Sequence, residues 1–318
     1  MDYRNLGRSG LRVSAVGLGC NNFGRRIGLA GSRPVIHKAL DLGVTLFDTA
    51  DIYGNKGGSE TILGKVLGAR RKDIVLASKF GLPMDEAGVL AGASRRYIMT
   101  AVEASLRRLG TDWIDLYQLH EPDPKTPIEE TLGALDDLIR QGKVRYVGCS
   151  NLPAWQVVDA RWTARTRGFN AFVSCQDEYS LLVRGLDAEL IPAMNALGMG
   201  LLPYFPLASG LLTGKYRRGK PMPKGARITS DPSYGERYMT KANWRIVEGL
   251  EAFAKRRGHT LLELAISWLL ARAPVASVIA GATRAAQVAA NVAAASWKLD
   301  AKERAEVDRI RGLAINPE

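Results

Sequence analysis

The sequence predicts an α/β protein built as a (β/α)₈ barrel, the TIM-barrel architecture, and two observations predict it. Short runs of β-branched or apolar residues alternate with amphipathic stretches, a pattern that is typical of a parallel sheet covered by helices. Eight such units fit into the 318 residues, which suits a barrel of about 250 residues with insertions. A doubly wound open sheet is the alternative that this alternation leaves open.

The predicted strands begin mostly about 30 residues apart, the length of one strand–helix–strand unit. In chain order they are residues 14–18, 45–47, 74–77, 114–119, 144–148, 171–174, 200–203 and 277–279. Ser59 precedes a helical apolar period over residues 62–67 and is predicted to be an N-cap. The same period runs over residues 98–109, and Gly110 is expected to end that helix.

Two segments fall outside the eight units. Residues 3–13, with Gly7 and Gly10 near the centre, predict a β-hairpin before the first barrel strand. Residues 205–240 form a long loop rich in Pro and Gly after the seventh strand, on the face where the strands end. Loops of this length commonly cover or bind a ligand. No change of composition marks a domain boundary, so residues 1–318 are predicted to form a single domain.

Composition excludes several classes of protein. Hydrophobic residues make up 46% and charged residues 24%, as in soluble globular proteins, which argues against a disordered, collagen-like or disulfide-scaffold chain. The three Cys and three His are scattered without metal-ligand spacing, so we expect no metal. Unpaired thiols, no visible signal peptide and no apolar run of membrane-spanning length predict a cytoplasmic protein without membrane insertion.

The net charge of +12 raises the question of nucleic-acid binding. The basic residues occur in small clusters, such as residues 70–72 and 255–257, mostly at predicted helix ends. Cations there complement the helix dipole and keep the surface soluble. No RNP, zinc-finger or basic-zipper pattern accompanies them, so we expect no nucleic-acid partner.

Four ionisable residues follow neighbouring strands at the ends where barrel active sites lie. Asp48 and Tyr53 follow the second predicted strand, Lys79 the third and His120 the fourth. Each alone has an ordinary structural explanation, as a cap, a loop aromatic, an ion-pair partner or a buried histidine. Their position on one rim predicts that they act together.

These four side chains are suited to donating a proton. A tyrosine hydroxyl has a pKa of about 10, and a nearby ammonium such as Lys79 is expected to lower it. A carboxylate keeps the ammonium charged, and a histidine can hydrogen-bond the substrate oxygen. The result is a general acid that faces a developing alkoxide. Such an alkoxide requires a hydride donor, which implies a nicotinamide cofactor.

Ordered blocks along nearly the whole chain resemble aldo-keto reductases, in particular the branch with potassium-channel beta subunits and bacterial members. The blocks are residues 3–14, 47–54, 58–60, 78–79, 115–120, 148–151, 176–182 and 207–215. The resemblance implies that Asp48, Tyr53, Lys79 and His120 form a catalytic tetrad, with Tyr53 as the proton donor. It also implies that NADPH supplies the hydride and that no metal takes part.

The segment after the eighth strand predicts a phosphate site. Residues 281–284 open a helix, and helix N-termini in this part of a barrel bind anions. Arg284 offers a bidentate fork that suits a phosphate better than a ribose hydroxyl, which favours NADP(H) over NAD(H). Thr283 alone could equally be an N-cap.

The resemblance assigns further cofactor contacts. It implies that Ser150, Asn151 and Gln176 hold the nicotinamide carboxamide and that Tyr204 stacks under the ring. It places Leu207, Ser209 and Lys215 along the pyrophosphate, and Gln287 and Asn291 at the adenine end. The remaining predicted cofactor contacts are Gly19, Asp48, Gly281, Thr283 and Arg284.

The chain departs from the family pattern at several positions. Phe205 stands where many relatives have Ser, which removes one expected side-chain contact to the pyrophosphate, and Ala280 stands where Pro is common. Asn21 and Asn22 are polar amides in a variable segment, where a substrate-facing role and a plain loop role both remain open.

The sequence therefore predicts NADPH-dependent reduction of a small aldehyde or ketone to an alcohol. The alternative, from another class of protein, is a nucleotide-sensing subunit of a membrane channel or complex with little turnover. No pattern specifies the physiological substrate, the direction of reaction in the cell, the oligomeric state or the conformation of the 205–240 loop.

Overall fold

Eight parallel strands form the centre of the computed structural model, which describes residues 1–312. The strands are β3 (Val16–Gly19), β4 (Leu46–Asp48), β5 (Val75–Phe80), β6 (Ile114–Leu119), β7 (Val144–Ser150), β8 (Ser174–Gln176), β9 (Gly200–Leu201) and β10 (Val278–Gly281). They are ordered β10-β3-β4-β5-β6-β7-β8-β9, so each strand lies beside its neighbour in the chain and β10 returns beside β3.

The two ends of this sheet meet. Leu201 in β9 forms a parallel bridge with Val275, just before β10. The amide of Ala276 donates to the carbonyl of Leu201 at 3.0 Å, and the amide of Ile279 donates to the carbonyl of Pro203 at 3.2 Å. These bonds close the ring, which confirms the (β/α)₈ barrel and excludes the open doubly wound sheet.

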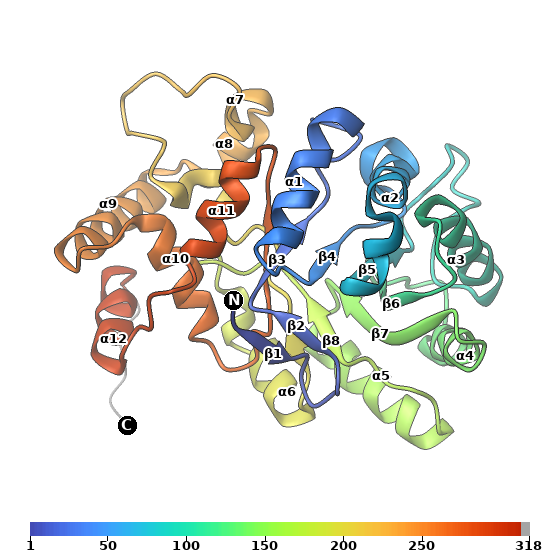
Figure 1. Cartoon of the computed structure of the whole chain (residues 1–318). Helices are drawn as coiled ribbons and strands as arrows, with labels where there is room; N and C mark the ends of the chain where they lie inside the picture. The colour runs from blue at the N-terminus through green and yellow to red at the C-terminus, as the bar shows by residue number, and fades with distance from the viewer. Residues whose placement is uncertain (313–318) are drawn as a thin grey trace.

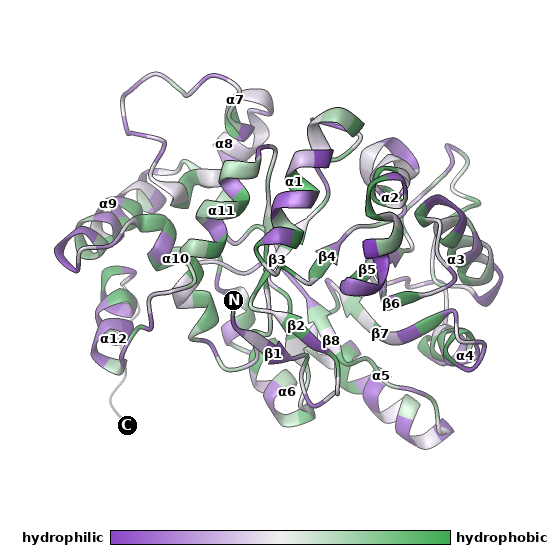
Figure 2. Cartoon of the chain, in the orientation of Figure 1, coloured by the Kyte–Doolittle hydropathy of each residue, from purple (hydrophilic) through white to green (hydrophobic). Residues whose placement is uncertain are grey.

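Helices follow the strands and surround the sheet (Figure 1). They are α1 (Leu29–Asp41), α2 (Tyr53–Leu67), α3 (Arg95–Leu109), α4 (Ile128–Arg140), α5 (Ala154–Arg167), α6 (Leu190–Leu197), α9 (Lys241–Arg256), α10 (Leu261–Leu270), α11 (Ala285–Ala293) and α12 (Ala301–Ile310). Figure 2 shows hydrophilic and hydrophobic residues along each outer helix. In α4, Leu132, Leu135 and Leu138 are buried at helical spacing, whereas Glu129 and Glu130 lie in the exposed first turn.

The N-terminal hairpin covers the inner core of the barrel. Strands β1 (Tyr3–Asn5) and β2 (Arg12–Ser14) pair antiparallel, which confirms the predicted hairpin. Leu6 and Val13 are fully buried and pack with apolar side chains that point inward from the barrel strands. Gly7 has φ +60°, and a Cβ there would lie 2.5 Å from the carbonyl oxygen of Gly198, so only glycine fits.

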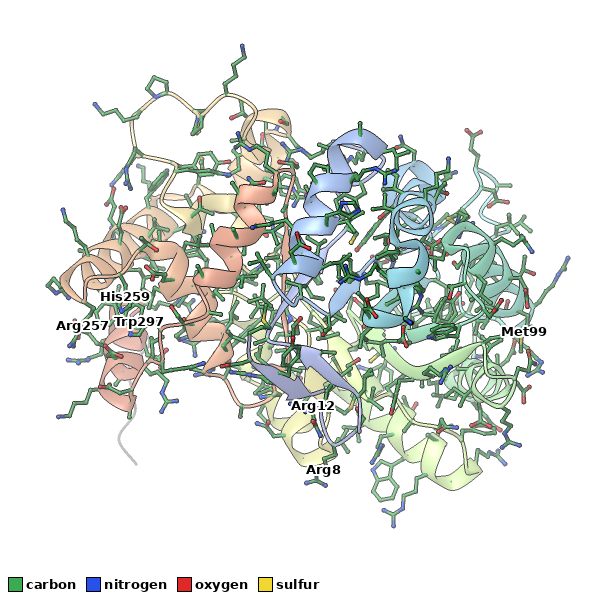
Figure 3. All side chains as sticks on the ribbon, viewed as in Figure 1. Arg8, Arg12, Met99, Arg257, His259 and Trp297 are labelled. Carbon is green, nitrogen blue, oxygen red and sulfur yellow. The ribbon has the colours of Figure 1, made fainter. Side chains whose placement is uncertain are left out.

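The C-terminal helix α12 follows a segment that packs on the outside of the barrel. The ring of His259, between α9 and α10, stacks on Trp297 with centroids 4.1 Å apart and an angle of 10° between the planes (Figure 3). Trp297 also stacks on Phe253 in α9. These aromatic contacts fix the chain beside α9 before α12 begins.

Some local predictions need correction. Ser59 is no N-cap: its buried hydroxyl donates to the carbonyl of Cys20 at 2.9 Å and accepts from Thr49 Oγ1, because this tertiary site uses its oxygen. Residues 54–57 of α2 all have positive φ, so α2 is kinked there and its right-handed part begins only after Gly57. Gly110 does end α3, as predicted, and it has a left-handed conformation with φ +62°.

The segment 205–240 contains short helices as well as loop. They are a 3₁₀ helix over Ala208–Thr213 and two short α-helices, α7 (Arg227–Ser230) and α8 (Ser233–Tyr238). Further 3₁₀ turns cover Gly68–Asp73 and Gly185–Asp187. Among residues 1–312, no helix combines the length and apolar character that crossing a membrane requires.

Candidate functional site

Lys79 is the centre of a buried polar cluster at the rim of the barrel. Its Nζ donates to both carboxylate oxygens of Asp48, at 2.9 and 2.8 Å, and to the carbonyl of Thr49 at 2.9 Å. A longer contact of 3.4 Å joins Nζ to the hydroxyl of Tyr53. Lys79 is fully buried, so these groups replace the water around its ammonium. The structure thus brings together three residues that lie apart in the sequence.

Two glutamine amides hold the other side of Asp48. Gln176 Nε2 donates to Asp48 Oδ1 at 2.7 Å, and Gln118 Nε2 lies 3.5 Å from the same oxygen. Sequence reasoning missed Gln118, although strand alternation places it on the same inward face as His120. Gln176 is predicted to be a cofactor contact; the structure shows its amide bound to the Asp48 carboxylate.

The pKa of Tyr53 differs from the sequence-based expectation. Burial raises it above the usual value of 10, and the Lys79 ammonium lowers it by less than burial raises it. Burial also disfavours the charged form of Lys79, but the carboxylate of Asp48 outweighs burial and raises the pKa of Lys79. The phenol is therefore protonated and the lysine charged at neutral pH, so Tyr53 holds a proton that it can donate.

His120 lies beside the phenol as a neutral ring. The Tyr53 and His120 rings meet edge to face, with centroids 5.7 Å apart and an interplanar angle of 79°. Burial, together with the nearby Lys79 ammonium, lowers the pKa of His120 from 6.5 to about 3. A neutral imidazole can donate one hydrogen bond to a ligand, but it does not supply a proton at physiological pH.

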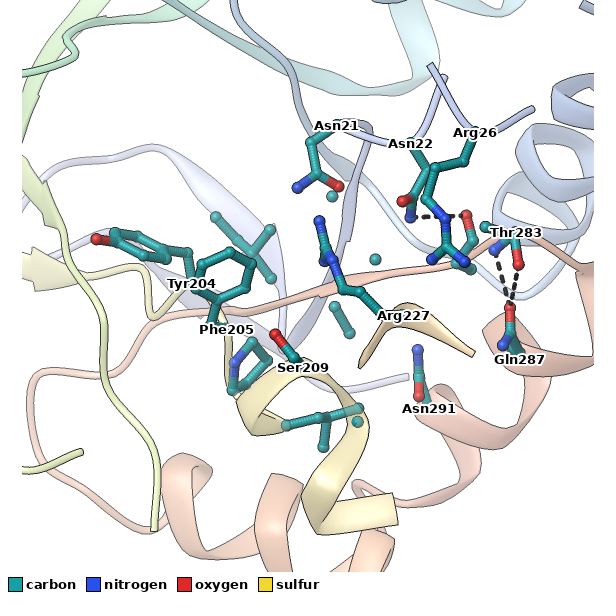
Figure 4. Close-up of a pocket in the computed structure, with 18 of the residues that line it drawn as sticks. Asn21, Asn22, Arg26, Tyr204, Phe205, Ser209, Arg227, Thr283, Gln287 and Asn291 are labelled. Atoms are coloured by element: carbon teal, nitrogen blue, oxygen red, sulfur yellow. Dashed lines mark hydrogen bonds between the residues drawn. The ribbon is translucent and has the colours of Figure 1, made fainter. Parts of the chain in front are cut away.

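Asp48, Tyr53 and His120 border a cavity of about 710 Å³. Figure 4 shows another part of its lining, which includes Tyr204, Ser209 and Asn291. Its walls include the last residues of several strands, among them Gly19, Asp48, Ser150, Gln176 and Gly281, so it opens at the C-terminal end of the barrel. Every predicted cofactor residue lines it, and Tyr53 and His120 do so too. Its volume suits a cofactor-sized ligand.

Positive charge gathers in this cavity. Its basic lining residues are Arg26, Lys215, Lys224, Arg227 and Arg284. Within residues 1–312, two carboxylates line it, Asp48 and Glu121, and Asp48 is already paired with Lys79. Burial lowers the pKa of Lys215, and the nearby arginines lower it further. Such a set of cations suits a ligand with several phosphate charges.

Three of these basic residues were not predicted from the sequence to lie at the site. Arg26 follows β3, whereas Lys224 and Arg227 belong to the long segment after β9. The Arg26 guanidinium donates to the carbonyl of Gly225 at 3.0 Å, which joins the two loops at the cavity. No sequence spacing relates positions 26 and 225, so this contact appears only in the folded chain.

Ser209 presents an unpaired hydroxyl to the cavity. The side chain is 6% exposed, and its Oγ has no hydrogen-bond partner among residues 1–312. Ala208 and Ser209 both have positive φ, an uncommon conformation for residues other than glycine. A buried polar atom without a partner is costly, and a ligand oxygen would satisfy it.

Asn151 links the two sides of the cavity. It accepts a hydrogen bond from the Tyr204 hydroxyl at 2.9 Å, and its Nδ2 donates to the carbonyl of His120 at 3.0 Å and to Ser150 Oγ at 3.1 Å. Ser150 Oγ donates in turn to the carbonyl of Gln176 at 2.7 Å. Tyr204 is therefore held in a fixed position relative to His120.

The loop before α11 forms the opposite end of the cavity. Gln287 Oε1 accepts from the amides of Thr283, at 2.8 Å, and Arg284, at 3.1 Å. Arg284, rather than Thr283, occupies the N-cap position, and its side chain is exposed. Asn22 Nδ2 donates to the carbonyl of Ala282 at 3.3 Å, whereas its buried Oδ1 has no partner in the described chain.

Asp177, directly after Gln176, is a buried carboxyl group that predicts a pH effect. Burial raises its pKa from 3.8 to about 7, and its Oδ2 has no partner within residues 1–312. The folded state therefore favours the protonated form, and stability is lost as the pH rises from about 4 to about 7. We expect D177N to raise the unfolding free energy by about 3 kcal/mol more at pH 8 than at pH 5.

Urea unfolding at the two pH values measures this difference. The exposed residue Asp112 provides a control, because D112N removes a carboxylate that water already solvates. An equal effect of D177N at both pH values would show that the buried carboxyl is not protonated on folding.

Comparison with known proteins adds an independent finding. The sequence profile described as "Aldo/keto reductase family" matches residues 15–311. The chain is 35% identical to the L-glyceraldehyde 3-phosphate reductase of Escherichia coli K12, over 97% of this chain and 92% of that protein. It is 37% identical to a probable voltage-gated potassium channel subunit beta of Arabidopsis thaliana, covering 92% and 91%. An uncharacterized oxidoreductase of Bacillus subtilis is 36% identical, covering 94% and 93%.

Within residues 1–312, no three His, Cys, Asp or Glu side chains gather as a metal site.

Proposed function

The chain belongs to the aldo/keto reductase family, and from this premise we propose that it reduces an aldehyde or ketone to an alcohol with NADPH. The observation that carries the proposal is the contact between Lys79 and Tyr53 at the edge of a cation-lined cavity. Both halves of the reaction need such a site: a proton donor for the oxygen and a binding place for a large anionic cofactor.

The residues present fit the dinucleotide. Cations, the unpaired hydroxyl of Ser209 and the N-terminus of α11 suit its phosphates. Ser150, Asn151, Gln176 and Tyr204 would hold the nicotinamide end. Leu207, Ser209 and Lys215 would lie along the pyrophosphate, and Gly281, Thr283, Arg284, Gln287 and Asn291 would hold the adenosine end. When bound, the reduced nicotinamide supplies the hydride that the carbonyl carbon receives.

The side chains of the site perform the proton chemistry. Tyr53 donates its hydroxyl proton to the carbonyl oxygen as negative charge develops there. Lys79 stabilises the resulting tyrosinate, and Asp48 keeps Lys79 charged and correctly placed. Neutral His120 donates a hydrogen bond to the same oxygen and orients the carbonyl.

A substrate screen tests the proposal. Because one relative is named for L-glyceraldehyde 3-phosphate, the first compounds should be short hydroxyaldehydes with and without a phosphate, followed by ketones, quinones and sugars. NADPH consumption is followed by absorbance with the full chain. Alcohol formation in step with NADPH loss supports the proposal, whereas no consumption with any compound would contradict it.

Arg284 provides a test of cofactor choice. We expect R284A to weaken NADPH binding by at least about tenfold while NADH binding changes little, because the lost guanidinium would pair with the extra phosphate of NADPH. Fluorescence titration with both nucleotides measures the two affinities. R161A, which removes an exposed arginine on α5, is the control. Equal losses for both nucleotides would remove the phosphate role.

A second candidate function is a nucleotide-sensing subunit of a channel or other complex. It is favoured by the similarity to plant proteins named as probable channel beta subunits. Sustained turnover with a free carbonyl compound separates the two functions, since a sensor would turn over slowly once the nucleotide had bound.

We further propose a single-domain, cytoplasmic protein that acts on small molecules. The three cysteines are buried as free thiols, which suits a reducing compartment. Five basic side chains line the cavity. A small anionic ligand bound there would explain part of the net positive charge of the chain without a nucleic-acid partner. Residues 313–318 of the predicted domain lie outside the described residues.

A further inference from the structure

We propose that Phe205 is a positioning residue: together with Tyr234, its ring holds the Arg227 guanidinium in the cavity, where it binds the phosphates of the dinucleotide. This inference rests on the proposed function. It deepens it by assigning a role to a residue that departs from the family pattern, where serine is common.

Arg227 is held by aromatic rings rather than by acids. Its guanidinium carbon lies 5.1 Å from the centre of the Phe205 ring and 5.2 Å from that of Tyr234, within the range of cation–π attraction. Arg217 and Arg237, from the same segment of the chain, pair with Glu251 and Glu178, whereas Arg227 forms no ion pair within residues 1–312.

Other charges near Arg227 repel it. Burial lowers its pKa, and the positive charges of Arg26 and Arg25 lower it further. A guanidinium in this position gains by moving out to water unless something attracts it inward. The electron-rich faces of two rings supply that attraction while the cavity contains no anion. Figure 4 shows Arg227 reaching into the cavity, with Phe205 on one side and Arg26 and Thr283 on the other.

The backbone of Phe205 supports a specific role for its ring. The residue has φ +48°, a left-handed conformation that bulky residues rarely adopt. Its ring meets Tyr204 edge to face at 5.4 Å and Tyr234 at 5.7 Å, so two aromatic rings fix its direction. Backbone strain of this kind persists where the surrounding structure requires it, and it is concentrated at ligand-binding sites.

These contacts explain what the exchange of the common serine for phenylalanine at position 205 does chemically. A serine hydroxyl at position 205 could bind a phosphate oxygen directly, whereas a phenyl ring cannot. The ring can instead seat a guanidinium, which is charged and donates several hydrogen bonds to a phosphate. Phe205 would thus replace a direct contact with one made through Arg227.

Direct binding of NADPH to the full chain, measured by calorimetry, tests the idea without turnover. We expect F205L to weaken binding roughly 5- to 20-fold, as the loss of a desolvated cation–π contact would. F205W keeps an aromatic face and should stay within about threefold of the wild type. F205G removes the ring and relaxes the left-handed backbone, so a loss equal to that of F205L identifies the ring as the cause.

A double-mutant cycle assigns the effect to Arg227. In the R227M background, F205L should cause no further loss of affinity, because the residue on which the ring acts is absent. W162L is the matched control, since it removes a similar contact with Arg165, at 5.2 Å, on the exposed face of α5. It should leave NADPH binding unchanged.

The outcomes are distinguishable. The positioning role of Phe205 would be wrong, and the proposed function would stand, in either of two cases. One is that F205L binds NADPH as the wild type does; the other is that F205L causes its full loss of affinity in the R227M background too. If the wild-type chain binds no NADPH, the proposed function fails and this inference fails with it.

Discussion

Replacing Tyr53 with phenylalanine is expected to lower kcat for carbonyl reduction by about a thousandfold or more, while NADPH affinity stays within about twofold. The change removes one oxygen, the hydroxyl whose proton is proposed to pass to the substrate. The phenyl ring keeps its position under the edge of His120 and beside Lys79, whose Nζ lies 4.8 Å from the ring centre.

The same contacts explain why Y53F should fold normally. Lys79 loses its longest hydrogen bond, of 3.4 Å, and keeps its shorter bonds to Asp48 and Thr49. The thermal midpoint should therefore change little, and a large fall in kcat cannot come from unfolding.

Single-turnover and steady-state assays, together with NADPH titration, measure the effect. Y97F is a matched control, because Tyr97 is also a buried tyrosine whose hydroxyl contacts a carboxylate, Asp51, at 3.3 Å. It should keep kcat within a few-fold of the wild type. Turnover by Y53F at a tenth of the wild-type rate would exclude the phenol as the proton donor.

Part of this site can be predicted from the sequence because of the geometry of the barrel. Asp48, Lys79 and His120 come at or next to the ends of successive strands, and these ends must meet at one rim in a closed parallel barrel. Strand order therefore suffices to predict that these residues lie close together, without knowledge of any contact. The predicted strand ends were less accurate: β5 continues to Phe80, three residues beyond the prediction, because polar Ser78 and Lys79 still pair with β6.

Loop contacts could not be predicted in the same way. The Arg26–Gly225 bond joins two loops far apart in the chain. The cavity loop also contains left-handed residues, such as Phe205 and Ser209, that no apolar period specifies. The pKa of Tyr53 also lay beyond the sequence. Burial and the Lys79 charge act in opposite directions, and their balance depends on depth in the fold.

The pairing of Asp48 with Lys79 predicts the largest effect on stability. Both side chains are buried, at 3% and 0% exposure, and each is the main partner of the other. Removing one partner of a buried pair leaves an uncompensated charge, which typically costs about 3–5 kcal/mol. We therefore expect K79M to lose about that much unfolding free energy at pH 7, and to lose activity as well.

The loss should depend on pH in a defined direction. Without the ammonium, protonation of the buried Asp48 carboxyl would remove its uncompensated charge. The variant should then be least destabilised at acid pH and lose stability as the pH rises towards neutrality. Urea unfolding at pH 5 and pH 7, with wild type and variant compared at each pH, measures this trend.

A second substitution separates the buried charge from the loss of packing. D48N in the K79M background removes the carboxylate but keeps a side chain of the same shape. The amide oxygen of the new asparagine can still accept hydrogen bonds from Gln176 and Gln118. The double variant should recover part of the lost stability, and its difference in stability from the wild type should no longer depend on pH. Reduction should remain absent, because nothing would stabilise the tyrosinate of Tyr53. If K79M were as stable as the wild type at pH 7, the ion pair would not hold this rim of the barrel together. If the double variant regained turnover, the ammonium would have no part in the proton transfer.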